Sequence, residues 1–242
     1  MTPPLAPPPG SPPLPAPCWP DWFEGLLERT RSLEARQFNR FAPPPGHRRR
    51  SAVLILFGAI SAAGAPGPAD ADVLLTERAA TMRSHAGQVA FPGGAIDPAD
   101  DGPAAAALRE AQEETGLDPA GVAVAGDLVD MYLPVSDFAV TPVLAWWWRP
   151  SPVGVMDARE VARVARVPVA ELLDPANRFR AVHPSGFISP AFQAGGWFIW
   201  GFTAGVLDQV LQLGGWERPW DRERLVDVPI DPDPPRDRSA SA

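Results

Sequence analysis

Residues 91–117, "FPGGAIDPADDGPAAAALREAQEETGL", carry the most informative pattern in this chain. This stretch joins a Gly-Gly pair, which we expect to form a turn, to an aspartate-rich loop and an alanine-rich segment that predicts a helix over 103–115. The proline that opens this segment suits a first helical turn, and Gly116 is typical of a helix C-terminus. We expect Asp100 or Asp101 to cap the N-terminus of the helix.

Glutamates crowd the last part of this predicted helix. Glu113 and Glu114 lie three and four residues after Glu110, so all three can project to one side, opposite a small apolar face. Like charges at this spacing weaken a helix by roughly 0.2–0.5 kcal/mol per pair. Such a face is commonly just solvated, but a divalent cation would relieve the repulsion, and carboxylates favour Mg²⁺ or Mn²⁺ over zinc. The adjacent Arg109 can hold a carboxylate or contact a phosphate.

The Gly-Gly pair and the run "REAQEETGL" (109–117) together resemble the Nudix box, G-x5-E-x7-R-E-U-x-E-E-x-G-U, in which U is a bulky apolar residue. The second U is met by leucine, whereas the first is only an alanine. The positions that match are Gly94, Arg109, Glu110, Ala111, Glu113, Glu114, Gly116 and Leu117.

The loop of this box departs from the family pattern. The first glutamate is absent and one residue is inserted, so the loop offers three aspartates in its place. Asp100 keeps the usual spacing from Gly94, whereas Asp101 keeps the usual spacing to Arg109, and Asp97 is a third candidate. The sequence leaves open which of the three replaces the glutamate.

A second resemblance lies just before the box. "LLTERAATMRSHAGQVAFPGG" (74–94) is similar to the segment that precedes the box in coenzyme A pyrophosphatases, L-L-T-x-R-x6-H-x-G-x3-F-P-G-G. Two later segments, 140–146 and 172–178, also resemble that subfamily, so the similarity covers about residues 50–210. The paired motifs are more specific than either one alone.

The resemblance implies an α+β fold, a Nudix-type α/β/α sandwich with a mixed sheet. The apolar run at 51–60 and the segment 72–78 predict two of its strands, and 195–215 predicts a strand that runs into a final helix. We expect one Nudix hydrolase domain over 21–230, with an N-terminal helix at 21–41 and a core at 50–210. A Pro-rich leader (1–20) and a polar tail (231–242) are expected to be disordered.

The implied activity is hydrolysis of the pyrophosphate bond of coenzyme A or its derivatives, with Mg²⁺ or Mn²⁺ as cofactor. The products would be adenosine 3′,5′-bisphosphate and 4′-phosphopantetheine. An alternative is a Nudix pyrophosphatase for ADP-ribose or another nucleoside diphosphate derivative. A third is a non-catalytic nucleotide-binding regulatory domain, suggested by the missing box glutamate.

The resemblance also assigns roles to residues. We expect Glu110 and Glu114 to bind the metal, with Glu113 as a third ligand or the general base. A backbone carbonyl of the Gly-Gly pair, at Gly94 or its predecessor, completes the expected coordination, because glycine allows close approach. The catalytic set comprises Glu113, Glu114 and Arg109.

Three basic residues before the box are candidates for substrate binding. Arg78, Arg83 and His85 either contact substrate phosphates or form structural ion pairs with the acidic loop at 97–101. The tryptophan run at 146–148 could stack on adenine, but alternation along a strand favours packing in the core or at a dimer interface.

Composition limits the partners and the location. The net charge of −8 argues against a nucleic-acid binder, which would present a basic face. A single cysteine, Cys18, excludes an intrachain disulfide and a multi-cysteine metal site. The sequence contains no secretory signal and no apolar stretch long enough to span a membrane. We therefore expect a cytoplasmic enzyme that acts on a small molecule and can form a homodimer.

Overall fold

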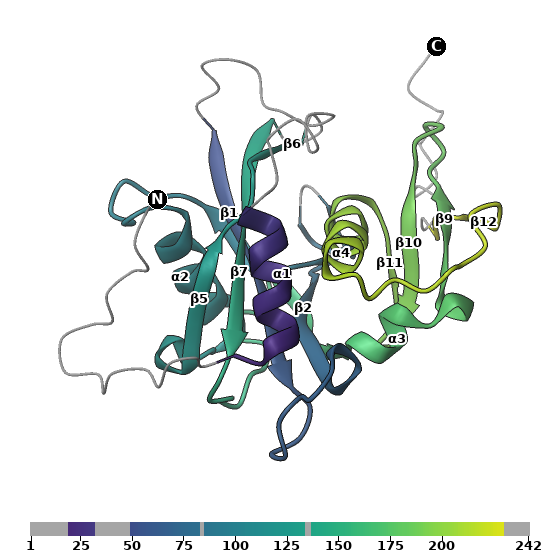
Figure 1. Cartoon of the computed structure of the whole chain (residues 1–242). Coiled ribbons are helices and arrows are strands. Elements are labelled where there is room, and N and C mark those ends of the chain that lie inside the picture. Colours follow the sequence, from purple (N-terminus) through teal and green to yellow (C-terminus); the bar gives the residue numbers. More distant parts are fainter. Residues whose placement is uncertain (1–18, 32–48, 83–84, 134–136, 230–242) are drawn as a thin grey trace, which may run out of the picture.

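The structure, a computed structural model, describes residues 19–31, 49–82, 85–133 and 137–229. Helices cover both faces of a central mixed sheet, and a smaller sheet lies to one side (Figure 1). The tail expected at 231–242 and nearly all of the expected leader therefore lie outside the described residues.

The central sheet is built around two long parallel strands. β1 and β7 pair in parallel, and every other pairing in this sheet is antiparallel. The main path is β3-β2-β1-β7-β5, while β4 pairs with β1, β6 with β7 and β8 with β2. The strands predicted at 51–60 and 72–78 are confirmed as β1 and β2. The strands are β1 (Arg50–Ala59), β2 (Ala71–Arg78), β3 (Val89–Ala90), β4 (Gly93–Ala95), β5 (Val122–Asp127), β6 (Met131–Leu133), β7 (Phe138–Trp147) and β8 (Val161–Pro168).

β1 is apolar on both faces because both faces of the sheet are covered. Leu54 and Leu56 lie in one buried cluster with the alanines of α2 (Pro103–Thr115). Ile55 and Phe57 lie in the opposite cluster, beneath α1 (Asp21–Arg31) and α4 (Gly201–Gly214). The small side chains on the buried face of α2 let this helix lie close to the sheet, which positions its glutamates.

The tryptophan run belongs to the core. Trp146 is 5% exposed and packs in the cluster beneath α1 and α4, whereas Trp147 is 1% exposed and packs on the α2 side. Trp148 returns to the side of Trp146 and is partly buried there. The predicted alternation and core packing are confirmed.

A second, four-stranded sheet follows the central one, in the order β11-β10-β9-β12. It lies beside α4 (Figure 1), and the predicted strand leading into the final helix is its edge strand β11. This sheet was not predicted from the sequence as a separate unit. Its strands and the remaining short helices are β9 (Arg178–Val182), β10 (Ile188–Ala194), β11 (Trp197–Ile199), β12 (Leu225–Asp227), α3 (Val169–Leu173), η3 (Pro68–Asp70), η4 (Pro119–Gly121) and η5 (Pro175–Asn177).

The N-terminal helix begins at Asp21 as predicted, and the described part ends at Arg31. The rest of the helix expected to reach residue 41 lies outside the described residues. Trp19, which the sequence analysis assigned to the disordered leader, packs against Phe23 with ring centroids 6.1 Å apart. In the described ranges, no helix has both the length and the apolar character needed to cross a membrane.

Candidate active site

The helix that carries the glutamates, α2, begins and ends at glycines. Its N-cap is Gly102, in the left-handed region with φ 88°, and no side chain caps the helix there. The expected cap by Asp100 or Asp101 is therefore wrong. At the other end Gly116 adopts a left-handed conformation, and its N–H donates to the carbonyl of Gln112 at 2.9 Å. The predicted helix bounds and the glycine stop are confirmed.

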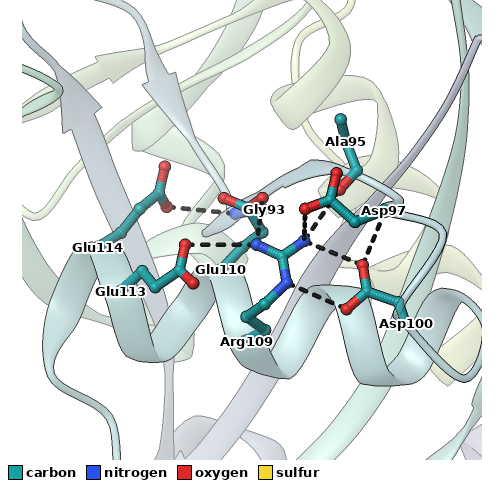
Figure 2. A network of polar contacts seen from close by, with 8 residues as sticks. All are labelled: Gly93, Ala95, Asp97, Asp100, Arg109, Glu110, Glu113 and Glu114. Atoms are coloured by element: carbon teal, nitrogen blue, oxygen red, sulfur yellow. Dashed lines mark hydrogen bonds and ion pairs between the residues drawn. The ribbon is translucent and has the colours of Figure 1, made fainter.

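Arg109 is the centre of a polar network on α2 (Figure 2). Its Nε and Nη2 donate to the two carboxylate oxygens of Asp100, both at 3.0 Å. Its Nη1 donates to Glu110 at 2.9 Å and to Glu113 at 3.3 Å, and Nη2 also reaches the carbonyl of Ala95 at 3.1 Å. One guanidinium thus holds the loop, strand β4 and two box glutamates together.

The structure distinguishes the three loop aspartates. Asp100 makes the bidentate contact, and the hydrogen bonds from Arg109 lower the pKa of its carboxyl. Asp97 is 3.8 Å from Arg109 and its side chain is 63% exposed, while its backbone N–H donates to Asp100 at 2.8 Å. Asp101 makes no hydrogen bond or ion pair with any described residue. Asp100, which keeps the usual spacing from Gly94, is therefore the loop aspartate that contacts α2.

The Gly-Gly pair forms strand β4, so the expected turn is wrong. Gly93 pairs with Val53 of β1, and a Cβ at Gly93 would lie 2.3 Å from the carbonyl oxygen of Ala52. A Cβ at Gly94 would lie 2.4 Å from the carboxyl carbon of Glu110. The first glycine therefore lets β4 close onto β1, and the second leaves room for a carboxylate beside the backbone.

Glu114 is the most deeply placed carboxylate of the site, with 8% of the residue exposed. Its Oε2 accepts the backbone N–H of Gly93 at 3.2 Å (Figure 2). Burial raises the pKa of Glu114 to about 7, and the negative charges of Glu110 and Glu160 add to this effect. The Gly93 hydrogen bond and the positive charge of Arg78 act in the opposite direction. A buried carboxylate with a second carboxylate nearby is an environment that a cation would stabilise.

The other two box glutamates differ in exposure. The side chain of Glu110 is 20% exposed, and burial raises its pKa against the lowering effect of Arg109. The side chain of Glu113 is 60% exposed and lies against Arg109. Among the described residues, no group of three or more His, Cys, Asp or Glu side chains is arranged to hold a metal ion. Carboxylate oxygens such as those of Glu110 and Glu114, whose charges act on each other, are the ligand type that Mg²⁺ and Mn²⁺ favour.

Two of the three basic residues predicted to bind substrate are described by the structure, and they differ in their hydrogen-bond partners. Arg78 ends β2, and its Nε is buried without a hydrogen-bond partner among the described residues. The expected ion pairs with the acidic loop are not formed by Arg78 or His85 in the described part of the chain. His85 has φ 57°, and its Nδ1 lies 2.9 Å from Oε1 of Gln88. Arg83 lies outside the described residues.

The family model for the NUDIX domain matches residues 58–187, more than half of the chain. The chain belongs to the Nudix family. The fold predicted from sequence is thereby confirmed as a Nudix fold, α+β with a mixed sheet.

Several enterobacterial Nudix proteins are similar to this chain. It is 43% identical over 157 residues to "Uncharacterized Nudix hydrolase NudL" of Cronobacter sakazakii, covering 61% of this chain and 77% of that protein. The protein of the same name in Klebsiella pneumoniae subsp. pneumoniae is 36% identical over 213 residues, covering 78% of this chain and 98% of that protein.

Solved Nudix structures also match. The Nudix hydrolase RenU of M. smegmatis is 28% identical with a TM-score of 0.39, covering 49% of this chain and 70% of that one. The NUDIX domain of Shewanella oneidensis NrtR, solved with ADP ribose, is 18% identical with a TM-score of 0.39, covering 58% and 87% of the two chains.

One acidic residue near the site was not singled out from the sequence. Glu160 immediately precedes β8, and its charge acts on Glu114. The surrounding run "DARE" (157–160) carries no motif that would mark this residue. Its proximity to α2 is a consequence of the fold.

Proposed function

We propose that this Nudix hydrolase cleaves the pyrophosphate bond of coenzyme A or a derivative of it, in a reaction that depends on Mg²⁺ or Mn²⁺. The observation that carries the proposal is the position of Arg78. This arginine belongs to the segment that resembles coenzyme A pyrophosphatases, and its positive charge acts on Glu114 of the box. Arg78 has an Nε with no hydrogen-bond partner among the described residues, and its charge acts on a box carboxylate, which suits a substrate phosphate bridged to a cation.

In this proposal Glu110, Glu114 and the Gly94 carbonyl hold the divalent ion. A bound divalent ion neutralises charge on pyrophosphate oxygens and lowers the pKa of a bound water. Arg109 keeps Glu110 in place, and Asp100 keeps Arg109 in place through the bidentate contact. Arg78 orients the substrate by a phosphate, and Arg83 and His85 are further candidates for that role.

A substrate panel tests the proposal. The protein is incubated with Mn²⁺ or Mg²⁺ and with coenzyme A, its thioesters or ADP-ribose, and products are identified by mass spectrometry. We expect 4′-phosphopantetheine and adenosine 3′,5′-bisphosphate from coenzyme A. Turnover of ADP-ribose without turnover of coenzyme A or its thioesters would reject the substrate assignment. Binding of nucleotides without any turnover would support the regulatory alternative.

Glu114→Gln tests the metal site in the same assay. We expect this variant to lose nearly all turnover, because it removes one of two carboxylates that hold the cation. Near-normal turnover would show that Glu114 is not a metal ligand. A homodimer and a cytoplasmic location stay predictions, which sedimentation analysis and cell fractionation can examine.

A further inference from the structure

The second sheet and α4 pack against the strands that lead into the site. They meet one row of the central sheet, in which Glu77 of β2 pairs with Val89 of β3 on one side and with Arg163 of β8 on the other. Each of these three residues is bound by the second sheet or by α4. The row lies immediately before Arg78, the proposed phosphate-binding arginine at the end of β2.

Three contacts hold this row. The indole N–H of Trp197 on β11 donates to Oε2 of Glu77 at 2.8 Å. The hydroxyl of Thr203 on α4 donates to the carbonyl of Val89 at 2.9 Å. The guanidinium of Arg163 lies over the Trp197 ring, 4.2 Å from the ring centroid. Trp197 therefore contacts β2 and β8, while Thr203 contacts β3.

Both hydrogen-bond donors are buried. Trp197 and Thr203 are each 5% exposed, so water has little access to either side chain. A buried N–H or O–H that loses its acceptor is costly, because water does not replace the lost partner. The two hydrogen bonds therefore hold β2 and β3 at a defined position relative to the second sheet and α4.

The position of Arg78 follows from this row. The register between β2 and β8 shifts between Glu77 and Arg78, and such a shift changes the direction in which a side chain points. After the shift, the Arg78 N–H donates to the carbonyl of Gln88 and its carbonyl accepts the N–H of Gly87, both at 3.0 Å. A displacement of Glu77 or Val89 would therefore carry Arg78 with it.

We propose that Trp197 and Thr203 are positioning residues that fix Arg78 for a phosphate of the substrate. This inference rests on the proposed function, because it requires Arg78 to bind the pyrophosphate substrate. A guanidinium binds a phosphate through hydrogen bonds of defined direction, so a small displacement weakens the contact. Neither Trp197 nor Thr203 touches the reacting atoms in this proposal, and both act through Arg78.

Trp197→Phe and Thr203→Val test the proposal, because each removes one hydrogen bond and keeps most of the side-chain volume. Trp220→Phe and Thr30→Val are matched controls, since each also removes a hydrogen bond of 2.8 Å, in the segment after α4 and within α1. The full-length variants are assayed for kcat and KM with the best substrate of the panel. Mn²⁺ affinity is measured by electron paramagnetic resonance, and the free energy of unfolding by urea.

We expect Trp197→Phe and Thr203→Val to raise KM by about five- to tenfold, with kcat and Mn²⁺ affinity close to wild type. The two control substitutions should leave KM unchanged, even where they lower the free energy of unfolding by as much as the test substitutions do. Thr203→Ser keeps the hydroxyl and should retain the wild-type KM.

Combination with Arg78→Gln separates positioning from a general loosening of the fold. Arg78→Gln alone should raise KM by about tenfold or more, because it removes the guanidinium. In the Arg78→Gln background, Trp197→Phe should raise KM by no more than about twofold, because two substitutions that act through one contact are not additive. Equal fold increases in the two backgrounds would show that Trp197 acts by another route and would overturn the proposal.

The remaining outcomes distinguish this inference from the proposed function. KM values of Trp197→Phe and Thr203→Val close to wild type would reject the positioning role and leave Arg78 as the phosphate-binding residue. An unchanged KM of Arg78→Gln would reject both roles. If the wild type hydrolyses ADP-ribose but not coenzyme A, the substrate assignment fails and the comparison proceeds on ADP-ribose. If the wild type hydrolyses no pyrophosphate at all, both proposals fail.

Discussion

Replacing Glu114 by glutamine should stabilise the metal-free protein at neutral and alkaline pH. Glu114 is 8% exposed, and its burial, together with the charges of Glu110 and Glu160, disfavours the ionised carboxylate. Glutamine is uncharged at every pH, fills nearly the same volume and keeps an oxygen that can accept the Gly93 N–H. The substitution therefore removes the cost of a buried charge and leaves the packing intact.

The size of the effect follows from the pKa of Glu114. A rise from the ordinary 4.5 to about 7 corresponds to about 3 kcal/mol, since a tenfold change in proton affinity is about 1.4 kcal/mol. The unfolded chain loses this proton at lower pH than the folded protein, so the folded state binds more protons between the two pKa values. Stability of the metal-free wild type thus falls as pH rises through this window. The cost is absent below about pH 4 and complete above about pH 8.

The assay is urea unfolding in EDTA of wild type, Glu114→Gln and Glu113→Gln from about pH 5 to about pH 8. We expect the free energies of unfolding of wild type and Glu114→Gln to diverge by about 3 kcal/mol across this range. Glu113, with a side chain 60% exposed, is the matched control, and its substitution should not give the stabilisation expected for Glu114→Gln. Added Mn²⁺ should stabilise the wild type more than Glu114→Gln, because the ion binds only the folded state.

Parallel pH dependence of the free energies of unfolding of wild type and Glu114→Gln in EDTA would contradict this prediction. That outcome would mean that the carboxylate is solvated in the folded protein or finds a compensating partner. Equal stabilisation of the two proteins by Mn²⁺ would separately contradict the role of Glu114 as a ligand.

Two further predictions concern the backbone and the loop of the site. Gly94→Ala should lower both Mn²⁺ affinity and turnover by about tenfold or more. The new Cβ would lie 2.4 Å from the carboxyl carbon of Glu110 and would push this carboxylate away. Gly205→Ala, whose Cβ would meet no atom within 4 Å outside the backbone of its own helix, should leave both unchanged. Asp100→Asn should lower kcat by about tenfold, because it weakens the ion pair that holds Arg109. Asp101→Asn should not lower kcat. Equal effects of the two substitutions in steady-state kinetics would contradict the assignment of Asp100 as the loop acid.

The elements with strong local patterns were predicted correctly. The bounds of α2 follow from a proline at the first turn, small apolar residues at helical spacing and a glycine at the stop. β1 follows from a branched apolar run, and the two faces of β7 follow from alternation along the strand. The second sheet was missed because its strands are short, and because β12 pairs with β9 across a long separation in the chain.

Within the site, local spacing predicted the box glutamates but not the residues that surround each of them in the fold. The box pattern pointed to Glu110, Glu113 and Glu114, yet their positions in the sequence do not reveal that one is buried and another is mostly exposed. The Gly-Gly pair was read as a turn because two glycines usually mark one. Its pairing with β1 depends on a strand that lies some forty residues earlier in the chain, which no short window contains.

The helix, its carboxylates, the glycines beside them and the membership of a metal-dependent family could all be predicted from the sequence. These features depend on residue type and on spacing of a few residues, which local chain geometry converts directly into position. The contact of Asp100 with Arg109 and the effect of the Glu160 charge on Glu114 arise only in the folded chain. Such contacts join segments that are distant in the chain, and the burial that raises the pKa of Glu114 exists only once β4 has closed onto β1.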